Sequence, residues 1–202
     1  MKTILPPELP HFEPYYRYAR VFSPPECEAL IQAAEHSGFA AGSICIGIGQ
    51  GQHPVIDLSY RCAQTARVLE TQCPWAFERV CERVEWANAE YRFDLHGLAE
   101  DIAVMRYDAP QGAQPAGHYG WHQDFGAGVY SRRKVSVVAL LSEPADFAGG
   151  DLLLFTDGER KADLSQRGDL VMFPSWVPHC VTPVTRGRRH TLVAWVSGAR
   201  FR

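Results

Sequence analysis

The chain lacks long apolar runs, tracts of one charge and paired cysteine motifs, and each absence argues against a class of protein. Its 202 residues carry a formal net charge of -3, and basic residues form only short runs such as Arg132-Arg133-Lys134, so no nucleic-acid or membrane partner is indicated. The six cysteines contain no C-x-x-C pair and are spread like ordinary small apolar residues, which favours reduced thiols. Pro6 and Pro7 interrupt the first apolar stretch before it reaches signal-peptide length, and no later segment approaches a membrane span. We expect a soluble, cytoplasmic protein whose partners are small molecules or proteins.

The length predicts one domain, residues 1–202, in which residues 1–98 form an N-terminal arm and supporting helices and residues 99–202 a core of strands. Tyr18 to Phe22 is a candidate strand. Ser23-Pro24-Pro25-Glu26 has the residues of a helix start, and that helix is expected to run to about His36, before Gly38. A second helix is predicted from Trp75 to Tyr91, after Pro74. The expected buried positions of the two helices are Cys27, Leu30, Ile31 and Ala34, and then Phe77, Val80, Val84 and Ala87.

After Asp94 the pattern changes to short apolar segments separated by Gly, Pro and Asp, and there is no internal repeat. This spacing predicts an antiparallel sandwich or jelly roll, a double-stranded β-helix, with the helices covering one outer face. The fold class is therefore α+β and mainly β. The predicted strands are Ile102 to Tyr107, Val135 to Leu141, Asp151 to Phe155, Asp169 to Phe173, Cys180 to Val184 and Thr191 to Val196.

The segment Gly47-Ile-Gly-Gln-Gly51 resembles a phosphate-binding loop only superficially. It lacks the Lys-Ser/Thr pair of a P-loop and the sixth-position glycine of a dinucleotide fingerprint. We expect a mobile loop or lid that extends to about Ser59.

The stretch His118-Tyr-Gly-Trp-His122-Gln-Asp124 contains the chain's most informative spacing. Residues i and i+2 of a strand point to the same face, so His122 and Asp124 would direct an imidazole and a carboxylate at one point. This donor pair suits a mid-first-row divalent metal. A helical zinc pair formed by His118 and His122 is the alternative, but it needs Glu at position 119, which is Tyr, and Gly117 and Gly120 disfavour a helix.

A third candidate ligand, His179, lies far downstream, and Arg189 follows it by ten residues. We expect both on one hairpin that turns near Arg186 and Gly187, which would place Arg189 roughly 15 Å along the ladder from His179. Arg189, Thr191, Val193 and Trp195 should share a face. The planar guanidinium of an arginine is suited to bidentate binding of a carboxylate.

Two histidines and one carboxylate with open metal positions are typical of non-haem Fe(II) oxygenases. In the order of its motifs, the sequence resembles the 2-oxoglutarate/Fe(II)-dependent dioxygenases, in particular the prolyl 4-hydroxylase-like, PKHD-type branch. The resemblance covers about residues 100–198 well and the N-terminal half loosely. The matching motifs are Arg106-Tyr107, His122-Gln-Asp124, Gly149-Gly-Asp-Leu152, Gly168-Asp-Leu-Val-Met-Phe-Pro174, His179-Cys-Val-Thr-Pro-Val184 and Gly187-Arg-Arg189 with Trp195.

The resemblance implies that His122, Asp124 and His179 hold Fe(II). It also implies that Arg189 binds the distal carboxylate of 2-oxoglutarate, with Tyr107 as a second contact. The implied reaction consumes O2, releases succinate and CO2 and hydroxylates an unactivated C–H bond of a peptidyl substrate, prolyl among the candidates, or of a free amino acid. Ascorbate is the reductant that the resemblance suggests. Related halogenases have a small residue at the position of Asp124, so hydroxylation is favoured.

Several assignments stay open. Arg186 and Arg188 are the competitors of Arg189, and a solvated turn is their alternative explanation. Ser136 stands where relatives often place a Tyr or Thr near the cosubstrate. His190 is expected to be structural, and the roles of His118, Trp121 and Gln123 are unassigned.

Two other functions remain: a jelly-roll binding module without catalysis, and a cupin-type enzyme that uses Zn or Mn. Metal content and a requirement for 2-oxoglutarate separate all three. Residues 42–59 and 108–120 are the expected loops of substrate choice, and nothing in them identifies a ligand or an oligomeric state.

Overall fold

The computed structural model describes residues 13–46 and 53–200. Two sequence predictions concern residues that lie outside these ranges: the start of the N-terminal arm and the run Gly47 to Gly51. Every strand pair described is antiparallel, as predicted.

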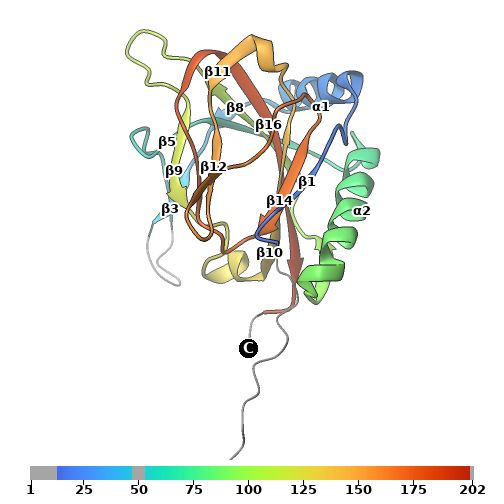
Figure 1. The fold of residues 1–202 in the computed structure, drawn as a ribbon. Helices are drawn as coiled ribbons and strands as arrows, with labels where there is room; N and C mark the ends of the chain where they lie inside the picture. Colours follow the sequence, from blue (N-terminus) through green and yellow to red (C-terminus); the bar gives the residue numbers. More distant parts are fainter. Residues whose placement is uncertain (1–12, 47–52, 201–202) are drawn as a thin grey trace, which may run out of the picture.

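A large sheet forms the centre of the molecule (Figure 1). Its strand order is β1-β14-β10-β16-β8-β6-β2, and β7 and β11 also pair with β16. The strands are β1 (Tyr16–Tyr18), β2 (Ala40–Ala41), β6 (Gln64–Val68), β7 (Leu95–Leu98), β8 (Ile102–Asp108), β10 (Arg133–Leu140), β11 (Phe147–Gly149), β14 (Leu170–Pro174) and β16 (Val184–Gly198).

A smaller sheet of order β13-β12-β15-β9-β5 faces the inner side of the large one. Its strands are β5 (Arg61–Cys62), β9 (His118–His122), β12 (Leu152–Phe155), β13 (Glu159–Lys161) and β15 (His179–Val181). A separate hairpin joins β3 (Ile44–Ile46) to β4 (His53–Val55). Short 3-10 turns occur at Gly128–Arg132 and Pro144–Asp146. The arrangement is the predicted jelly roll.

Both predicted helices are confirmed: α1 spans Pro24–Ser37 and α2 spans Pro74–Tyr91. The N-terminus of α1 is closed by Glu26, whose carboxylate accepts a hydrogen bond of 2.7 Å from the backbone N–H of Ser23. Gly38, at a φ of 85°, ends α1 in a backbone conformation that glycine adopts most readily. All eight helix positions that periodicity predicted to be buried are buried.

Among the residues described, neither helix is long and apolar enough to cross a membrane.

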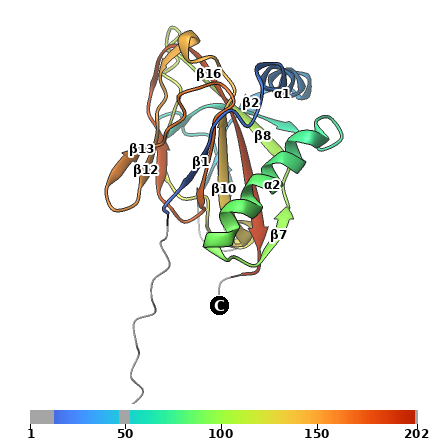
Figure 2. The ribbon, with the colours of Figure 1, turned by 45° about the vertical axis from the view of Figure 1, so that its right-hand side comes forward.

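The large sheet separates two apolar layers, as Figure 2 shows by placing α2 on one side of β10 and β12 on the other. Strand β14 illustrates the division: Leu170 and Met172 pack toward the helices, whereas Val171 and Phe173 pack between the two sheets. This alternation follows from the two-residue period of a strand. The helices thus pack on the outer face of the large sheet and stabilise it there. The inner face, toward the small sheet, can hold a functional site.

Three details of the prediction are wrong. The first strand is β1, not Tyr18 to Phe22, and β6 was not predicted. The expected hairpin from His179 to Arg189 does not form, because β15 belongs to the small sheet and β16 to the large one. The chain crosses between sheets after Val181, and Gly187 lies inside β16 rather than in a turn. The division of the chain at residue 98 stays a prediction.

A buried carboxylate fastens β1 to the sheet edge. Asp169 is fully buried beside β14 and accepts hydrogen bonds from the Arg17 guanidinium (2.8 Å), the Arg20 N–H (3.0 Å) and the Gln166 N–H (3.0 Å). Burial alone would raise the pKa of this carboxyl, but its hydrogen bonds hold the pKa below the usual range.

We predict that Asp169→Asn lowers the free energy of unfolding by about 2–4 kcal/mol at pH 7, because an amide cannot satisfy three donors. The pKa of Asp169 is lower in the folded protein than in the unfolded chain, where it is about 4. The stabilisation by the ionised carboxylate is therefore fully present above pH 4, and it is lost as the pH falls through the pKa of the folded protein. Urea denaturation at pH 7 and at pH values well below 4 measures both effects. Asp163→Asn is the control, since Asp163 pairs with the same Arg17 at 52% side-chain exposure and should cost under about 1 kcal/mol. Equal losses in the two variants would contradict the assignment.

Candidate metal centre

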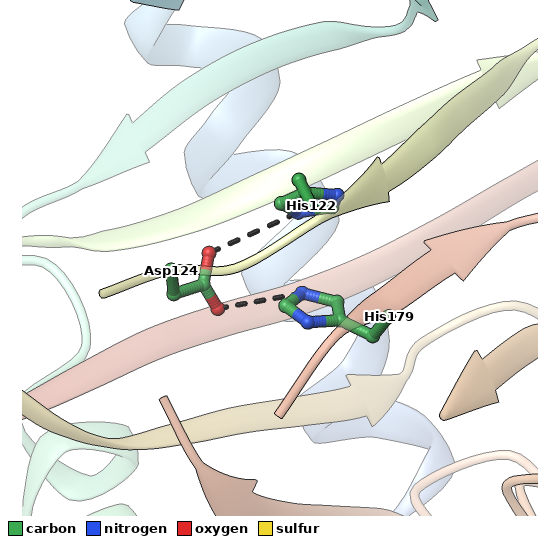
Figure 3. A group of neighbouring side chains, drawn as sticks. All are labelled: His122, Asp124 and His179. Carbon is green, nitrogen blue, oxygen red and sulfur yellow. Dashed lines mark ion pairs between the residues drawn. The ribbon is translucent and has the colours of Figure 1, made fainter. Parts of the chain in front are cut away.

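Two neighbouring strands of the small sheet bring the three predicted ligands together. In the pairing of β15 with β9, His179 lies directly opposite His122. Asp124 follows the end of β9, where its backbone N–H and that of Phe125 both donate to the Ser175 carbonyl at 3.0 Å. Figure 3 shows the carboxylate of Asp124 between the two imidazoles. One ligand atom from each residue lies within 4.8 Å of the others, and no other such group occurs in the described ranges.

Backbone carbonyls orient both imidazoles. The Nδ1 of His122 lies 2.8 Å from the Gly120 carbonyl, and the Nδ1 of His179 lies 3.0 Å from the Val177 carbonyl. A carbonyl only accepts, so each Nδ1 carries a proton, and Nε2 is the ring nitrogen of each histidine that can bind a metal. These nitrogens face Asp124, at 3.9 Å for His122 and 3.4 Å for His179. The cluster therefore offers two imidazole nitrogens and a carboxylate, which fits a divalent ion such as Fe(II).

Electrostatics favour metal-binding protonation states of His122 and Asp124. Burial, and then the neighbouring His179, lowers the pKa of His122 to about 3. Burial would raise the pKa of Asp124, but the two imidazoles and a hydroxyl hold it below its usual range. At neutral pH the two groups are thus a neutral base and an anion, the forms that bind metal.

Ser136 holds the carboxylate in place, a role that the sequence prediction missed. Its hydroxyl donates to Asp124 at 2.6 Å, and the Ser175 hydroxyl lies 3.0 Å away from that of Ser136. Ser136 is fully buried on β10. The sequence signal was present: two-residue alternation of an otherwise apolar strand leaves one polar side chain facing the inside.

The cluster opens into a cavity of about 670 Å³ between the two sheets. Arg189 and Tyr107 line the same cavity and lie directly opposite each other on β16 and β8. The guanidinium carbon of Arg189 lies 5.6 Å from the Tyr107 ring centroid. Arg189, Thr191, Val193 and Trp195 all line the cavity, which confirms that they share a face.

Arg189 is a buried cation with unused hydrogen-bonding capacity. It is 2% exposed, and its Nη1 atom has no hydrogen-bond partner within the described ranges. Burial lowers the pKa of this guanidinium, yet arginine stays charged in proteins. Gly150 provides room for it, since a Cβ there would come 2.7 Å from Arg189 Cδ. A carboxylate would supply the missing partner and countercharge.

The competing arginines are engaged elsewhere. Arg186 donates to the carbonyls of Ala145 and Phe147, and Arg188 forms a 2.5 Å ion pair with Asp108. Neither lines the cavity.

The remaining polar candidates also have defined positions. His190 is buried outside the cavity, where its backbone N–H donates to Ser142 at 2.7 Å. Both ring nitrogens of His118 contact carbonyls, those of Ala116 and Ser59, and β9 is a strand, which removes the helical zinc alternative. Trp121 is exposed and packs edge-on against Phe155. Gln123 lines the cavity and donates to the Trp176 carbonyl.

Comparisons with known proteins agree with this site. The sequence model of the 2OG-Fe(II) oxygenase superfamily matches residues 102–197. This segment contains the three residues of the cluster, His122, Asp124 and His179, and also Arg189. The segment is similar in sequence to the 2OG-Fe(II) oxygenases, so the predicted resemblance is confirmed.

The similar proteins include PKHD-type hydroxylases and prolyl hydroxylases. A PKHD-type hydroxylase of Synechococcus sp. (strain CC9605) is 38% identical over 105 residues, which are 52% of this chain and 45% of the relative. The matched part of the chain thus spans about half the length of that curated relative. A Pseudomonas putida prolyl-4-hydroxylase has a TM-score of 0.68 at 22% identity, covering 92% of this chain and 93% of that one. A Trichoplax adhaerens prolyl hydroxylase, solved with a hypoxia inducible factor peptide fragment, has a TM-score of 0.66 at 18% identity, covering 92% and 84%.

We predict that Asp124→Ala abolishes binding of one Fe(II) per chain, and that Ser136→Ala weakens it by about 10–100-fold, because outer hydrogen bonds orient metal ligands. Anaerobic titration calorimetry measures both affinities. Ser142→Ala removes a buried hydroxyl far from the cluster and serves as the control, with unchanged affinity expected. Tight binding by Asp124→Ala would show that the metal is held elsewhere.

Proposed function

We propose that the protein is a 2-oxoglutarate- and Fe(II)-dependent dioxygenase. It hydroxylates an unactivated C–H bond of a peptidyl substrate, prolyl among the candidates, or of a free amino acid, and it releases succinate and CO2. The observation that carries the proposal is the position of Arg189 in the cavity of the His122, Asp124 and His179 cluster, where its buried Nη1 has no hydrogen-bond partner among the described residues.

The roles of the residues follow from their chemistry. His122, Asp124 and His179 would hold Fe(II), which when bound supplies a centre for oxygen activation. Arg189 would bind the distal carboxylate of 2-oxoglutarate bidentately. Burial raises the pKa of Tyr107, so its hydroxyl stays protonated at neutral pH and can donate to the same carboxylate.

The surroundings of the cavity serve orientation and exclusion of water. Val138, Leu152 and Val193 line it together with the polar groups. An apolar wall strengthens the electrostatic contacts of a bound dicarboxylate and keeps it in one position. The prolyl hydroxylase relatives, one of them solved with a peptide fragment, support a peptide or amino-acid substrate. Ascorbate as reductant and a cytoplasmic location stay predictions.

We predict that purified protein with Fe(II), ascorbate and O2 converts 2-oxoglutarate to succinate, slowly without substrate, and that Arg189→Met raises the KM for 2-oxoglutarate about 30-fold or more. The reason is the loss of one partner of a buried charge pair, which costs about 2 kcal/mol or more. Proton NMR of succinate and 2-oxoglutarate measures the rate.

Arg186→Met is the matched control, since it removes an arginine three residues away that lies outside the cavity. It should leave the KM unchanged. A KM that rises equally in both variants, or succinate formation that does not depend on Fe(II), would contradict the proposal. Absence of any 2-oxoglutarate consumption would favour the binding-module or cupin alternatives.

A further inference from the structure

We infer that Arg61 binds a carboxylate of the substrate, so that the substrate is a small carboxylic acid such as a free amino acid, or the C-terminal residue of a peptide, rather than an internal residue of a neutral segment. This inference rests on the proposed function for the position of the reaction. Carboxylate binding itself requires no metal.

Arg61 is a second buried guanidinium in the cavity of the metal cluster. It is 9% exposed and lines that cavity from β5, at the edge of the small sheet. Its Nη1 donates to the Ser43 carbonyl at 2.6 Å, and its Nη2 contacts the Thr65 hydroxyl at 3.1 Å. Its buried Nε has no hydrogen-bond partner within the described ranges. The guanidinium is thus fixed in place with donor capacity unused.

No carboxylate neutralises this charge in the described part of the chain. Two acids line the cavity, and both are engaged elsewhere. Asp124 belongs to the metal cluster, and Asp57 accepts hydrogen bonds from the backbone and hydroxyl of Ser59. All recorded partners of the Arg61 guanidinium are neutral: a carbonyl, a hydroxyl, the Met105 sulfur and the Tyr119 ring.

The other arginines of the cavity differ from Arg61 in this respect. Arg133 forms a two-pronged pair with Glu100, at 2.7 and 2.6 Å. Arg67 is exposed and donates to the Asp101 carbonyl. Arg189 is assigned to the cosubstrate. Arg61 is therefore the cavity's buried positive charge that remains for a second anion.

A purely structural role does not explain a charge at this position. A neutral donor could bridge Ser43 and Thr65. Burying a cation costs several kcal/mol, of which the contact with the Tyr119 ring offsets only about 0.5–2 kcal/mol. Gly42 also leaves space for the charged group, because a Cβ there would come 2.6 Å from Arg61 Nε. The fold thus accommodates a buried cation, and a ligand would supply its missing countercharge.

The position of Arg61 relative to the metal cluster sets the size of the substrate. Its guanidinium carbon lies 4.6 Å above the Tyr119 ring, and that ring stacks on His122 with 3.6 Å between centroids. One aromatic ring therefore lies between the proposed anion site and a proposed metal ligand. A carboxylate at Arg61 would place the side-chain carbons of an amino acid near the metal, with little room for further residues on the carboxyl side.

The test uses metal-free protein and matched probes. The probes are the N-acetylated forms of proline, leucine, lysine and glutamine, each as the acid and as the neutral amide. The Arg61 Nε–Hε resonance in ¹⁵N NMR spectra, assigned by its loss in Arg61→Lys, reports on the site, and titrations give dissociation constants. Free amino acids and N-acetylated dipeptide acids then distinguish a free amino acid from a peptide C-terminus.

We expect at least one acid to shift the Arg61 resonance and to bind about 10–100-fold more tightly than its amide. Arg61→Met should remove this preference, Arg61→Lys should keep part of it, and Arg67→Met, which removes an exposed charge at the same cavity, should keep all of it. Spectra of each variant establish that it is folded. If Arg61→Met is unfolded, the wild-type resonance and Arg61→Lys carry the test.

Two results would overturn the inference: no acid binds more tightly than its amide, or the preference survives in Arg61→Met but disappears in Arg189→Met. The second result would mean that the probes bind at the cosubstrate arginine. Failure of the proposed function is distinguishable, because it would appear in 2-oxoglutarate turnover and not in this metal-free measurement.

Discussion

The pairing of β15 with β9 is the contact on which the rest of the site depends. Its register sets His179 opposite His122, and the two backbone bonds to the Ser175 carbonyl hold Asp124 at the end of the same strand. A shift of one residue would turn each of these side chains to the other face. Carbonyl contacts then fix each imidazole tautomer. The backbone hydrogen bonds thus determine the relative positions of the three candidate ligands.

The large sheet completes the site from the opposite side. Strand β16 presents Arg189 and Trp195 to the cavity while Leu192 and Ala194 pack toward the helices. One strand therefore supports both the core and the proposed cosubstrate contact. Because α1 and α2 cover only the outer face, the inner face can hold polar groups, and the cavity contains two buried guanidiniums with unused donors. Two such cations suit two anionic ligands, a cosubstrate and a substrate carboxylate.

Much of this could be predicted from local patterns, and the rest could not for a physical reason. The helices were predictable because helix-start residues, prolines at the first turn and a 3.6-residue apolar periodicity are local signals. The i, i+2 spacing likewise placed His122 and Asp124 on one face. The hairpin prediction failed because the local sequence after Val181 is compatible both with a turn back onto the same sheet and with a crossing to the other sheet. Only the pairing with distant strands decides between them. Ser136 and Arg61 were not assigned their contacts, since these join segments distant in the chain, such as Ser136 with Ser175 and Arg61 with Met105.

The most direct test of the central claim, that one cavity holds metal and cosubstrate together, is an anaerobic absorption measurement. Fe(II) and 2-oxoglutarate are added to the purified protein, and the visible metal-to-ligand charge-transfer band is recorded. The account predicts a weak band that needs both components, is absent in Asp124→Ala and appears only at much higher 2-oxoglutarate concentration in Arg189→Met. A folded wild-type protein that binds iron but gives no band with 2-oxoglutarate would contradict it.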